Sequence, residues 1–574
     1  MNNSKERFAS NRFASKYIII TLFFTGAAIM VLEILGARII GPYYGVDLYV
    51  WTSLITVTLI SLSIGYWSGG KIADKRPEID LLYLFIFLAG IFMFLIPSIS
   101  GPVLKLSRIF GVRGGALLSS CILFMIPLIF LGMVTPFSVK LITRELKSLG
   151  ATAGKLYAIS TFGSFLGTLL CGFILIPNAG IKKIIYWQAI VLILFWAGWK
   201  LLSRKGQKTL IAAPFLVIAA AFGSERAVEA IKYKAQSLYG EIKVADIKEQ
   251  RWLLIDGTSH TVIHKNMGES LFEYFYYFEI MPLLSLSREQ EAKQALRLQR
   301  IQSEAANEPA AGKASFAATG RRLLLLGLGG GAVAKAFSEY GIKVDAVEID
   351  PKVAEASKKY FNAGKYAENI YLGDAREYLT KYLTMENANV STNVVADLGL
   401  PNNVAAERSS ATKYDFVVLD AFSSAGHPFH LYTIENFKEI KKILKEDGIF
   451  GLNSLGSYEG KNSRVWKSVY KTLKEAFGYV RVFPVKIGTE AGPTIFIASK
   501  RDIFTQVDAK LSRNKTTKKF IEKMLDNEVI TVSDAQNAIV LTDDYNPLEL
   551  WDLDTTASTR KLLFEVFGDE ILFD

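Results

Sequence analysis

The sequence of 574 residues has little of what disulfide or metal proteins need. It contains two cysteines, Cys121 and Cys171, and four histidines, so a disulfide framework and a structural zinc site are both excluded and no metal is expected. Charged residues make up 21% of the chain, below the roughly 25% of soluble domains, while hydrophobic residues make up 50%. This composition argues against a disordered chain and against one that is soluble throughout.

Positive charge is concentrated in the first part of the chain. Residues 1–223 carry 21 Lys and Arg against seven Asp and Glu, a net charge of +14, whereas residues 224–574 have a net charge of −3. The basic residues lie between hydrophobic runs and not on a water-soluble face, so they do not form a nucleic-acid footprint. No nucleic-acid partner is therefore expected.

Residues 1–223 predict a transmembrane helical domain of six or seven spans. Crossing ~30 Å of hydrocarbon takes about 20 helical residues. Six apolar runs are long enough, at 17–37, 50–69, 81–99, 115–138, 156–177 and 183–202; a shorter run at 210–223 spans, re-enters or lies in the interface. With a cytoplasmic N-terminus, fifteen basic residues fall inside and six outside, as the positive-inside rule favours. We expect a multi-pass protein of the cell (inner) membrane, with the lipid bilayer as a partner and with the second half in the cytoplasm.

Two features stand out inside the apolar runs. Glu33 is an intramembrane acid, which makes it a functional candidate unless it pairs with Arg38 near the membrane surface. Gly163 and Gly167 have the GxxxG spacing that predicts close packing between helices.

The remaining chain predicts an α/β protein. Residues 224–284 read as a small β module, with strands at 241–246 and 252–257 and a turn at Asp256-Gly257. Residues 285–320 read as a linker or insertion. Strand and helix alternation over 321–574, with an insertion near 383–412, predicts a doubly wound Rossmann-like parallel sheet of the adenosylmethionine-dependent methyltransferase type. The aromatic segment 274–278 is expected to be a helix face packed on that domain.

A glycine-rich turn follows the first strand of this sheet. The apolar strand 323–326 runs into Gly327, Gly329, Gly330 and Gly331, and a helix is expected from 332 to 340. Glycines at such a turn let a ligand approach the backbone at the positive end of the helix. Taken alone, the turn fits NAD, FAD or an adenosyl cofactor.

Three successive strands then end in an acid. The strands at 344–347, 370–372 and 416–419 deliver Glu348, Asp374 and Asp420. Open α/β sheets bind ligands at this carboxyl edge, and Glu348 is about 20 residues after the glycines, placed to bind ribose hydroxyls. A row of acids suits a cationic sulfonium nucleoside better than the two phosphates of a dinucleotide. S-adenosylmethionine or a derivative is therefore favoured over NAD as the ligand. The alternative for each of the three acids is that it is a solvated residue at a strand end and binds no ligand.

Six motifs together resemble the spermidine synthase family, the polyamine aminopropyltransferases. They are Gly327–Gly331, Val347–Asp350, Gly373–Ala375, Tyr414–Asp420, Pro428–Leu431 and Leu541–Glu549. The resemblance covers most of 233–550. The apolar half is similar to the membrane region of the family's bacterial membrane-fused branch, the fused transporter and spermidine synthase proteins.

The resemblance implies aminopropyl transfer from decarboxylated S-adenosylmethionine, or from S-adenosylmethionine, to a cationic amine or polyamine, which releases methylthioadenosine. It implies that Glu348 holds the ribose, Asp374 the adenine, and that Asp420 faces the reacting end. The implied cofactor-binding set is Gly327, Gly329, Gly330, Gly331, Glu348, Asp374, Ala375 and Asp420. A homodimer is left open.

The catalytic side departs from the family pattern. The family has a second aspartate three residues after the one matching Asp420, and here that position is Ser423, which cannot act as a base without a partner. His427 and His430, on the following loop, are the available bases, because an imidazole takes a proton near neutral pH. The alternative for His430 is a packed loop residue. The candidate catalytic residues are Asp420, Ser423, His427 and His430.

The acceptor side departs further. Where the family has a Tyr-Gln pair, this chain has Tyr239 and Gly240. His260 stands in place of the family's glutamine after Asp-Gly, and Phe278 stands in place of its histidine before Glu279. Tyr239 either orients the acceptor or covers the cofactor. Asp543 and Asp544 either place a cation or cap a helix. The candidate substrate residues are Tyr239, His260, Glu279, Asp543 and Asp544.

Two other functions fit the same residues. Methyl transfer would use the same three acidic strand ends and would release S-adenosylhomocysteine. A polyamine or nucleoside transporter or sensor would bind its ligand without turnover.

Overall fold

The structure is a computed structural model. It describes residues 12–44, 48–143, 148–203, 229–287, 320–388, 413–422, 426–503, 507, 509–529 and 538–551. The chain divides into two compact units, with the main boundary near residue 230. The apolar run at 210–223, most of both predicted insertions, and Ser423 lie outside the described residues.

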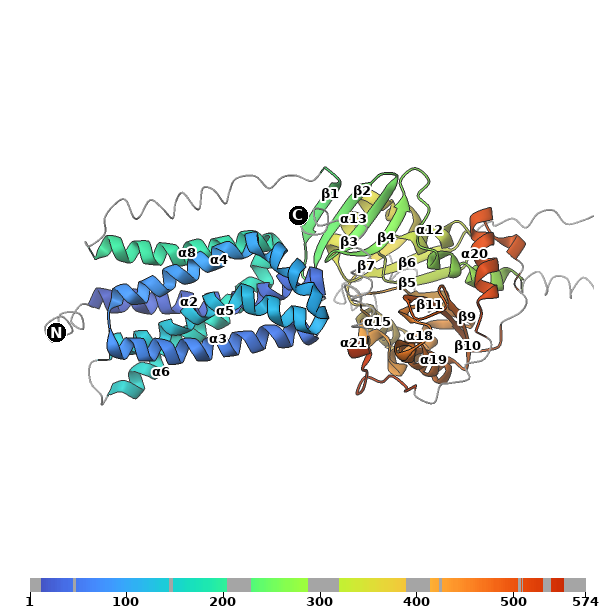
Figure 1. Cartoon of the computed structure of the whole chain (residues 1–574). Helices are drawn as coiled ribbons and strands as arrows, with labels where there is room; N and C mark the ends of the chain where they lie inside the picture. The colour runs from blue at the N-terminus through green and yellow to red at the C-terminus, as the bar shows by residue number, and fades with distance from the viewer. Residues whose placement is uncertain are drawn as a thin grey trace, which may run out of the picture. The chain divides into compact units, whose positions relative to one another are not determined.

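The first unit is built from long apolar helices (Figure 1). Among the described residues, six are long and apolar enough to cross a membrane, and each overlaps one of the six predicted runs. They are α2 (Arg12–Tyr44), α3 (Leu48–Lys75), α4 (Ile79–Ser107), α5 (Gly111–Ile142), α6 (Leu149–Leu170) and α8 (Ile181–Leu202). A π-helical turn, η3 (Cys171–Leu175), continues α6 into the short α7 (Ile176–Asn178).

Glycines let α6 approach α2 closely. A Cβ atom at Gly167 would lie 2.8 Å from the Cβ of Ala27, and one at Gly163 would meet the backbone of Phe23. The close packing predicted from the GxxxG spacing is therefore present.

Glu33 and Arg38 both lie on α2, where the sequence allowed them to pair. Within the described part of the chain they form no ion pair. Arg38 instead donates a hydrogen bond to the carbonyl of Leu238.

The β module is a four-stranded sheet in the order β1-β2-β3-β4. Its strands are β1 (Ile231–Gln236), β2 (Glu241–Ile247), β3 (Gln250–Ile255) and β4 (Thr258–His264). Asp256 and Gly257 have φ values of 47° and 71°, and two left-handed residues fit the tight hairpin turn that joins β3 to β4.

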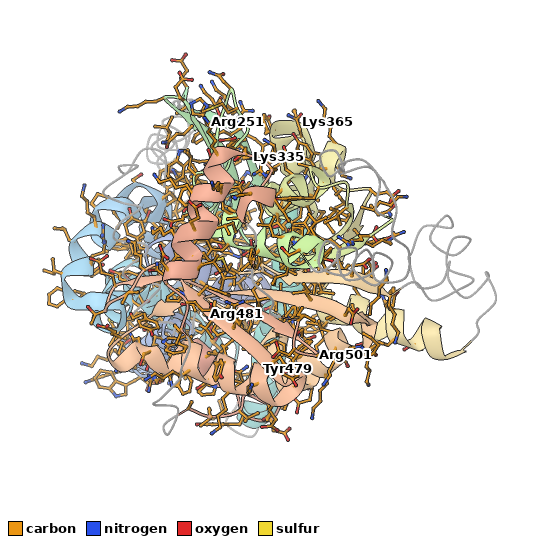
Figure 2. All side chains as sticks on the ribbon, turned by 90° about the vertical axis from the view of Figure 1, so that its right-hand side faces the viewer. Arg251, Lys335, Lys365, Tyr479, Arg481 and Arg501 are labelled. Carbon is orange, nitrogen blue, oxygen red and sulfur yellow. The ribbon has the colours of Figure 1, made fainter. Side chains whose placement is uncertain are left out.

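The β module packs against the α/β domain. Ile242 and Val244 join Val353 and Phe361 of α13 (Pro351–Phe361) in one apolar cluster. Two basic side chains labelled in Figure 2 add polar contacts across the junction. Arg251 of β3 donates to the carbonyl of Tyr360 at 2.9 Å, and Lys335 donates to that of Gly268 at 2.8 Å.

The larger sheet has seven strands in the order β10-β11-β9-β8-β5-β6-β7. Their bounds are β5 (Arg322–Leu326), β6 (Lys343–Glu348), β7 (Asn369–Leu372), β8 (Tyr414–Leu419), β9 (Leu444–Ser457), β10 (Tyr479–Pro484) and β11 (Ala491–Ser499). Strands β5 to β9 are parallel, as predicted, but β11 runs antiparallel to both β9 and β10. The chain between β10 and β11 is too short for the crossover that a parallel pair needs, so the sheet is mixed.

Helices pack on both faces of this sheet. One apolar core contains α15 (Ala375–Ala388), α18 (Ile434–Ile443) and α19 (Arg464–Phe477), and the other contains α10 (Tyr274–Tyr277), α12 (Ala332–Ser338) and α20 (Lys515–Asp526). The domain also contains the short α-helices α14 (Ala363–Tyr366) and α21 (Leu548–Trp551). The aromatic segment is buried as α10. The domain thus has the predicted Rossmann-like, methyltransferase-type fold, and its carboxyl edge carries the candidate site.

Candidate active site

The glycine-rich turn joins β5 to α12 and needs its glycines. Gly327, Gly329 and Gly331 have φ values of 95°, 50° and 79°, which L side chains rarely adopt. A Cβ atom at Gly327 would lie 2.5 Å from the carbonyl oxygen of Asp420, and one at Gly331 would lie 2.8 Å from the Cβ of Ala363. The turn therefore brings the ends of β5 and β8 into direct contact.

Each backbone N–H from Gly327 to Gly331 donates to an acceptor within the protein. In chain order the acceptors are Val347 O at 2.9 Å, Glu348 Oε2 at 3.1 and 3.4 Å, Thr261 Oγ1 at 2.8 Å and Leu328 O at 2.8 Å. A phosphate-binding turn instead directs its N–H groups at the ligand. This arrangement weighs against a dinucleotide and is compatible with a nucleoside that carries no phosphate.

A β-bulge on the β module faces this turn. The register between β3 and β4 shifts between Leu253 and Leu254, which makes His260 the extra residue on β4. Bulges re-aim neighbouring side chains. The next residue, Thr261, reaches the N–H of Gly330. His260 therefore lies beside the contact between the module and the turn, and its role toward substrate stays a prediction.

Glu348 ends β6 and is 8% exposed. Its Oε2 accepts the N–H groups of Leu328 and Gly329, and its Oε1 accepts that of Asp350 at 3.0 Å. Burial raises the pKa of this carboxyl, with the three N–H donors opposing it. A carboxylate offers about four acceptor positions, so about one remains for a ligand donor such as a ribose hydroxyl. The ribose role itself stays a prediction.

Asp374 follows β7 and caps α15. Its Oδ1 accepts the N–H groups of Arg376 and Glu377 at 2.9 and 3.0 Å, while its Oδ2 lies 2.9 Å from Nε2 of His430. Burial alone would raise the pKa of Asp374, but His430 and the two N–H donors outweigh it and lower the pKa. Ala375, the first residue of α15, is 7% exposed.

Asp420 follows β8 and is held by two neutral donors. Asn453 Nδ2 donates to its Oδ1 at 3.0 Å, and the Tyr274 hydroxyl donates to its Oδ2 at 3.3 Å. Burial raises the pKa of Asp420 to about 6, against the effect of both donors. Among the described residues no basic side chain pairs with it. The site therefore offers a half-buried carboxylate suited to a cationic ligand.

Neither of these donors is recognisable from the sequence. Tyr274 was contained in an aromatic segment whose only visible signal was apolar packing, and Asn453 lies on β9, a strand for which no functional motif was found.

The two candidate histidines have different surroundings. His427 is buried, with its Nε2 2.9 Å from Ser454 Oγ and accepting the N–H of Leu455 at 3.0 Å. That nitrogen is thus already an acceptor for the protein. His430, in the short helix η4 (Phe429–Leu431), pairs with Asp374 and not with Asp420. The role of either imidazole as a base stays a prediction, as does that of Ser423.

Glu279 occupies a buried polar cluster. Arg513 donates to its two oxygens, each at 2.9 Å, and the hydroxyls of Tyr340 and Thr517 donate at 3.0 and 3.3 Å. These four donors use about the whole accepting capacity of the carboxylate. The arrangement is that of a clamp between elements of the α/β domain, and it gives the predicted substrate role no support.

The remaining substrate candidates lie near the surface. Asp543 forms a bidentate pair with Arg376, with both distances 2.6 Å, and this arginine lowers its pKa. Asp544 is exposed. Tyr239, between β1 and β2, is 47% exposed. The substrate roles of all three stay predictions.

No group of three potential metal ligands occurs among the described residues. Fold and site together define a class: an α/β domain with methyltransferase-type topology and a row of carboxylates along its carboxyl edge. Residues 311–510 match the family model described as the spermine/spermidine synthase domain, so the chain carries a domain of that family.

Three comparisons illustrate this similarity. A polyamine aminopropyltransferase of Vibrio vulnificus is 26% identical over 238 residues, 40% of this chain and 69% of the relative. Polyamine aminopropyltransferase 2 of Aquifex aeolicus is 24% identical over 497 residues, 84% of this chain and 87% of the relative. The crystal structure of a probable spermidine synthase from Corynebacterium glutamicum is 17% identical, with a TM-score of 0.37, over 55% of this chain and 98% of that one. The family model and the two sequence relatives class the C-terminal domain with aminopropyltransferase-type enzymes.

Proposed function

We propose that this chain is a membrane-anchored aminopropyltransferase, which transfers the aminopropyl group of decarboxylated S-adenosylmethionine to an amine. The observation that carries the proposal is Asp420, a half-buried carboxylate at the carboxyl edge that two neutral donors hold and no described cation neutralises. Both substrates are cationic, and a half-buried negative charge without a cationic partner among the described residues attracts them.

In the proposed reaction the acceptor amine lies against Asp420. Its nitrogen attacks the propyl carbon next to the sulfonium, so that a C–N bond forms and a C–S bond breaks. The electrons of the broken bond neutralise the sulfur, and methylthioadenosine leaves. Because a protonated amine has no lone pair, it gives up one proton before the attack, and Asp420 accepts that proton. A carboxyl pKa of about 6 keeps Asp420 largely charged at neutral pH and ready to accept that proton.

The adenosyl part of the cofactor is assigned to the glycine-rich turn and the neighbouring strand ends. Glu348 would bind the ribose through its remaining acceptor position. Asp374 would bind the adenine in the same way, and Gly327 to Gly331 let the nucleoside lie against the backbone. The absence of a free N–H among the five residues of the turn favours this ligand over a dinucleotide.

We assign the six apolar helices to a membrane domain whose two ends lie on the same side. The excess of fifteen basic residues over six supports a cytoplasmic location for that side, by the positive-inside rule. The adenosyl cofactor is made there, so the catalytic domain would meet it directly.

The test is to incubate the full-length protein, purified in detergent, with S-adenosylmethionine or its decarboxylated form and a panel of amines. Mass spectrometry then identifies the nucleoside product. Methylthioadenosine supports aminopropyl transfer, S-adenosylhomocysteine supports methyl transfer instead, and cofactor binding without product supports a sensor. Asp420→Asn is expected to lower the rate at least about 100-fold, whereas Asp447→Asn, at an exposed position, keeps it. The absence of any nucleoside product would contradict the proposal.

A further inference from the structure

The segment Leu541–Asn546 has no function in the reaction proposed above, yet it is fixed firmly to the cofactor side of the domain. The Leu541 carbonyl accepts the N–H of Ile434 at 2.9 Å, and Asn546 donates to the carbonyl of Phe429 at 2.8 Å. The segment is thereby tied to the backbone on both sides of His430.

One ion pair extends this connection to α15. Asp543 binds the guanidinium of Arg376 through both oxygens, each at 2.6 Å. The same guanidinium donates to the carbonyl of His430 at 3.2 Å. A bidentate carboxylate fixes the plane of a guanidinium as well as its position. Asp543 therefore determines where Arg376 holds the backbone of His430.

Arg376 and His430 both bind Asp374. The N–H of Arg376 donates to Oδ1 at 2.9 Å, and the imidazole of His430 lies 2.9 Å from Oδ2. With the N–H of Glu377 also on Oδ1, three of about four acceptor positions are used, and the open one is on Oδ2. The direction of that position depends on the imidazole, and hence on the Arg376–Asp543 pair.

An open carboxylate acceptor discriminates between purines. The 6-amino group of adenine donates an N–H to it, whereas the 6-oxo group of hypoxanthine brings a second acceptor and is repelled. A binding site made for a donor rejects the analogue that lacks the donor.

We propose that Asp543 and Arg376 are positioning residues that aim Asp374 at a 6-aminopurine, so that the Leu541–Asn546 segment sets the base selectivity of the nucleoside site. The inference rests on the proposed adenosyl ligand.

The experiment measures the binding of methylthioadenosine and methylthioinosine to the full-length protein in detergent by calorimetry. Wild type is expected to prefer the adenine nucleoside. Asp543→Asn and Arg376→Met are each expected to lower the adenine affinity about tenfold, the loss of one hydrogen bond to a charged group. Methylthioinosine does not make that hydrogen bond, so its affinity should stay the same. The preference for methylthioadenosine over methylthioinosine should therefore fall by about the same factor. The double variant should lose no more than either single variant, because both act through one contact.

A matched control lies at the opposite edge of the sheet. Arg481 of β10, labelled in Figure 2, forms a bidentate pair with Glu528, and its side chain is about as exposed as that of Arg376. Arg481→Met and Glu528→Gln remove an equivalent pair and should leave the preference unchanged. Arg376→Lys keeps the positive charge but lacks the planar guanidinium, so it should lose part of the preference for the adenine nucleoside. This variant provides the test if Asp543→Asn and Arg376→Met fail to fold.

Each outcome has a separate meaning. If wild type discriminates between the bases and the Asp543 and Arg376 variants do so equally well, this inference is wrong while the proposed function stands. If wild type binds neither nucleoside, the proposed function and the inference are both wrong. A reduced preference in the Arg481 and Glu528 variants as well would show general loosening and would also overturn the inference.

Discussion

The hydroxyl of Tyr274 donates a hydrogen bond to Asp420 at 3.3 Å, although 146 positions separate the two residues in sequence. Tyr274 lies on α10 and is 9% exposed. Together with Asn453 it stabilises the carboxylate without adding positive charge. Asp420 therefore keeps a pKa of about 6 and changes its charge near neutral pH.

Removing this hydroxyl should move the pH dependence of the reaction. In Tyr274→Phe the charged form of Asp420 loses a donor, so its pKa rises above about 6. A hydrogen bond to a charged group is worth roughly 1.5 kcal/mol, so the rise is about one pH unit. We expect kcat/KM to fall several-fold near pH 6 and to change little at pH 8, because the acid limb of the profile shifts to higher pH.

Tyr276→Phe is the matched control for this measurement. It lies on the same helix and donates to the carbonyl of Ser270 at 2.9 Å, away from Asp420. Its acid limb should coincide with that of wild type. An unmoved limb in Tyr274→Phe would mean that Asp420 is not the group whose titration limits the rate.

Asp420→Asn should gain stability while it loses activity. Burial raises the pKa of Asp420 from 3.8 to about 6, so the folded state bears the cost of a buried charge at high pH. The cost is fully present above pH 6, declines as the pH falls, and disappears below pH 4. Two pKa units correspond to about 3 kcal/mol, an upper limit for the gain of the asparagine variant. Asn453 can accommodate the new amide, because its Oδ1 has no partner among the described residues.

Thermal unfolding of wild type and Asp420→Asn at pH 8 and pH 4 measures this effect. The variant should have the higher Tm at pH 8, by several degrees, and the two should converge at pH 4. A difference of the same size at both pH values would show that charge burial is not its cause.

The sequence was sufficient to locate the acids but not their partners. Each strand ends where its apolar run ends, and parallel strands place their carboxyl ends at one edge, so Glu348, Asp374 and Asp420 follow from local pattern. The six long apolar runs were predictable for the same reason: hydropathy over about 20 residues is a local property.

The partners depend on tertiary contacts that no local spacing reports. Tyr274 reaches Asp420 only because α10 packs under the sheet, and Arg376 reaches Asp543 across 167 positions. The antiparallel edge was missed for another reason. An apolar strand such as β10 or β11 has the same sequence pattern in a parallel and in an antiparallel pair. Its direction depends on the length of the segment that connects it to the neighbouring strand.

Glu279 offers a direct test between a clamp and a substrate ligand. Glu279→Gln leaves Arg513 with its charge buried and only partly paired, and breaking a buried pair in this way costs about 3 kcal/mol. We expect a lower Tm and an unchanged KM for the acceptor amine. Glu368→Gln removes an exposed pair with Lys343, 3.0 Å apart, and should cost less than about 1 kcal/mol. A raised KM with a normal Tm in Glu279→Gln would restore the substrate role.

The orientation of the apolar helices can be tested by labelling single cysteines with an impermeant maleimide on intact cells. Ile109, in the short helix η1 (Arg108–Phe110) between α4 and α5, is 81% exposed, and Glu78 immediately precedes α4. In a background without Cys121 and Cys171, Ile109→Cys should be labelled and Glu78→Cys should not, because the positive-inside rule places the segment before α4 in the cytoplasm. Lysed cells, in which both should be labelled, are the control. Labelling of Glu78→Cys alone would reverse the orientation and move the proposed catalytic domain away from its cofactor. Labelling of both in intact cells would mean that α4 does not cross the bilayer.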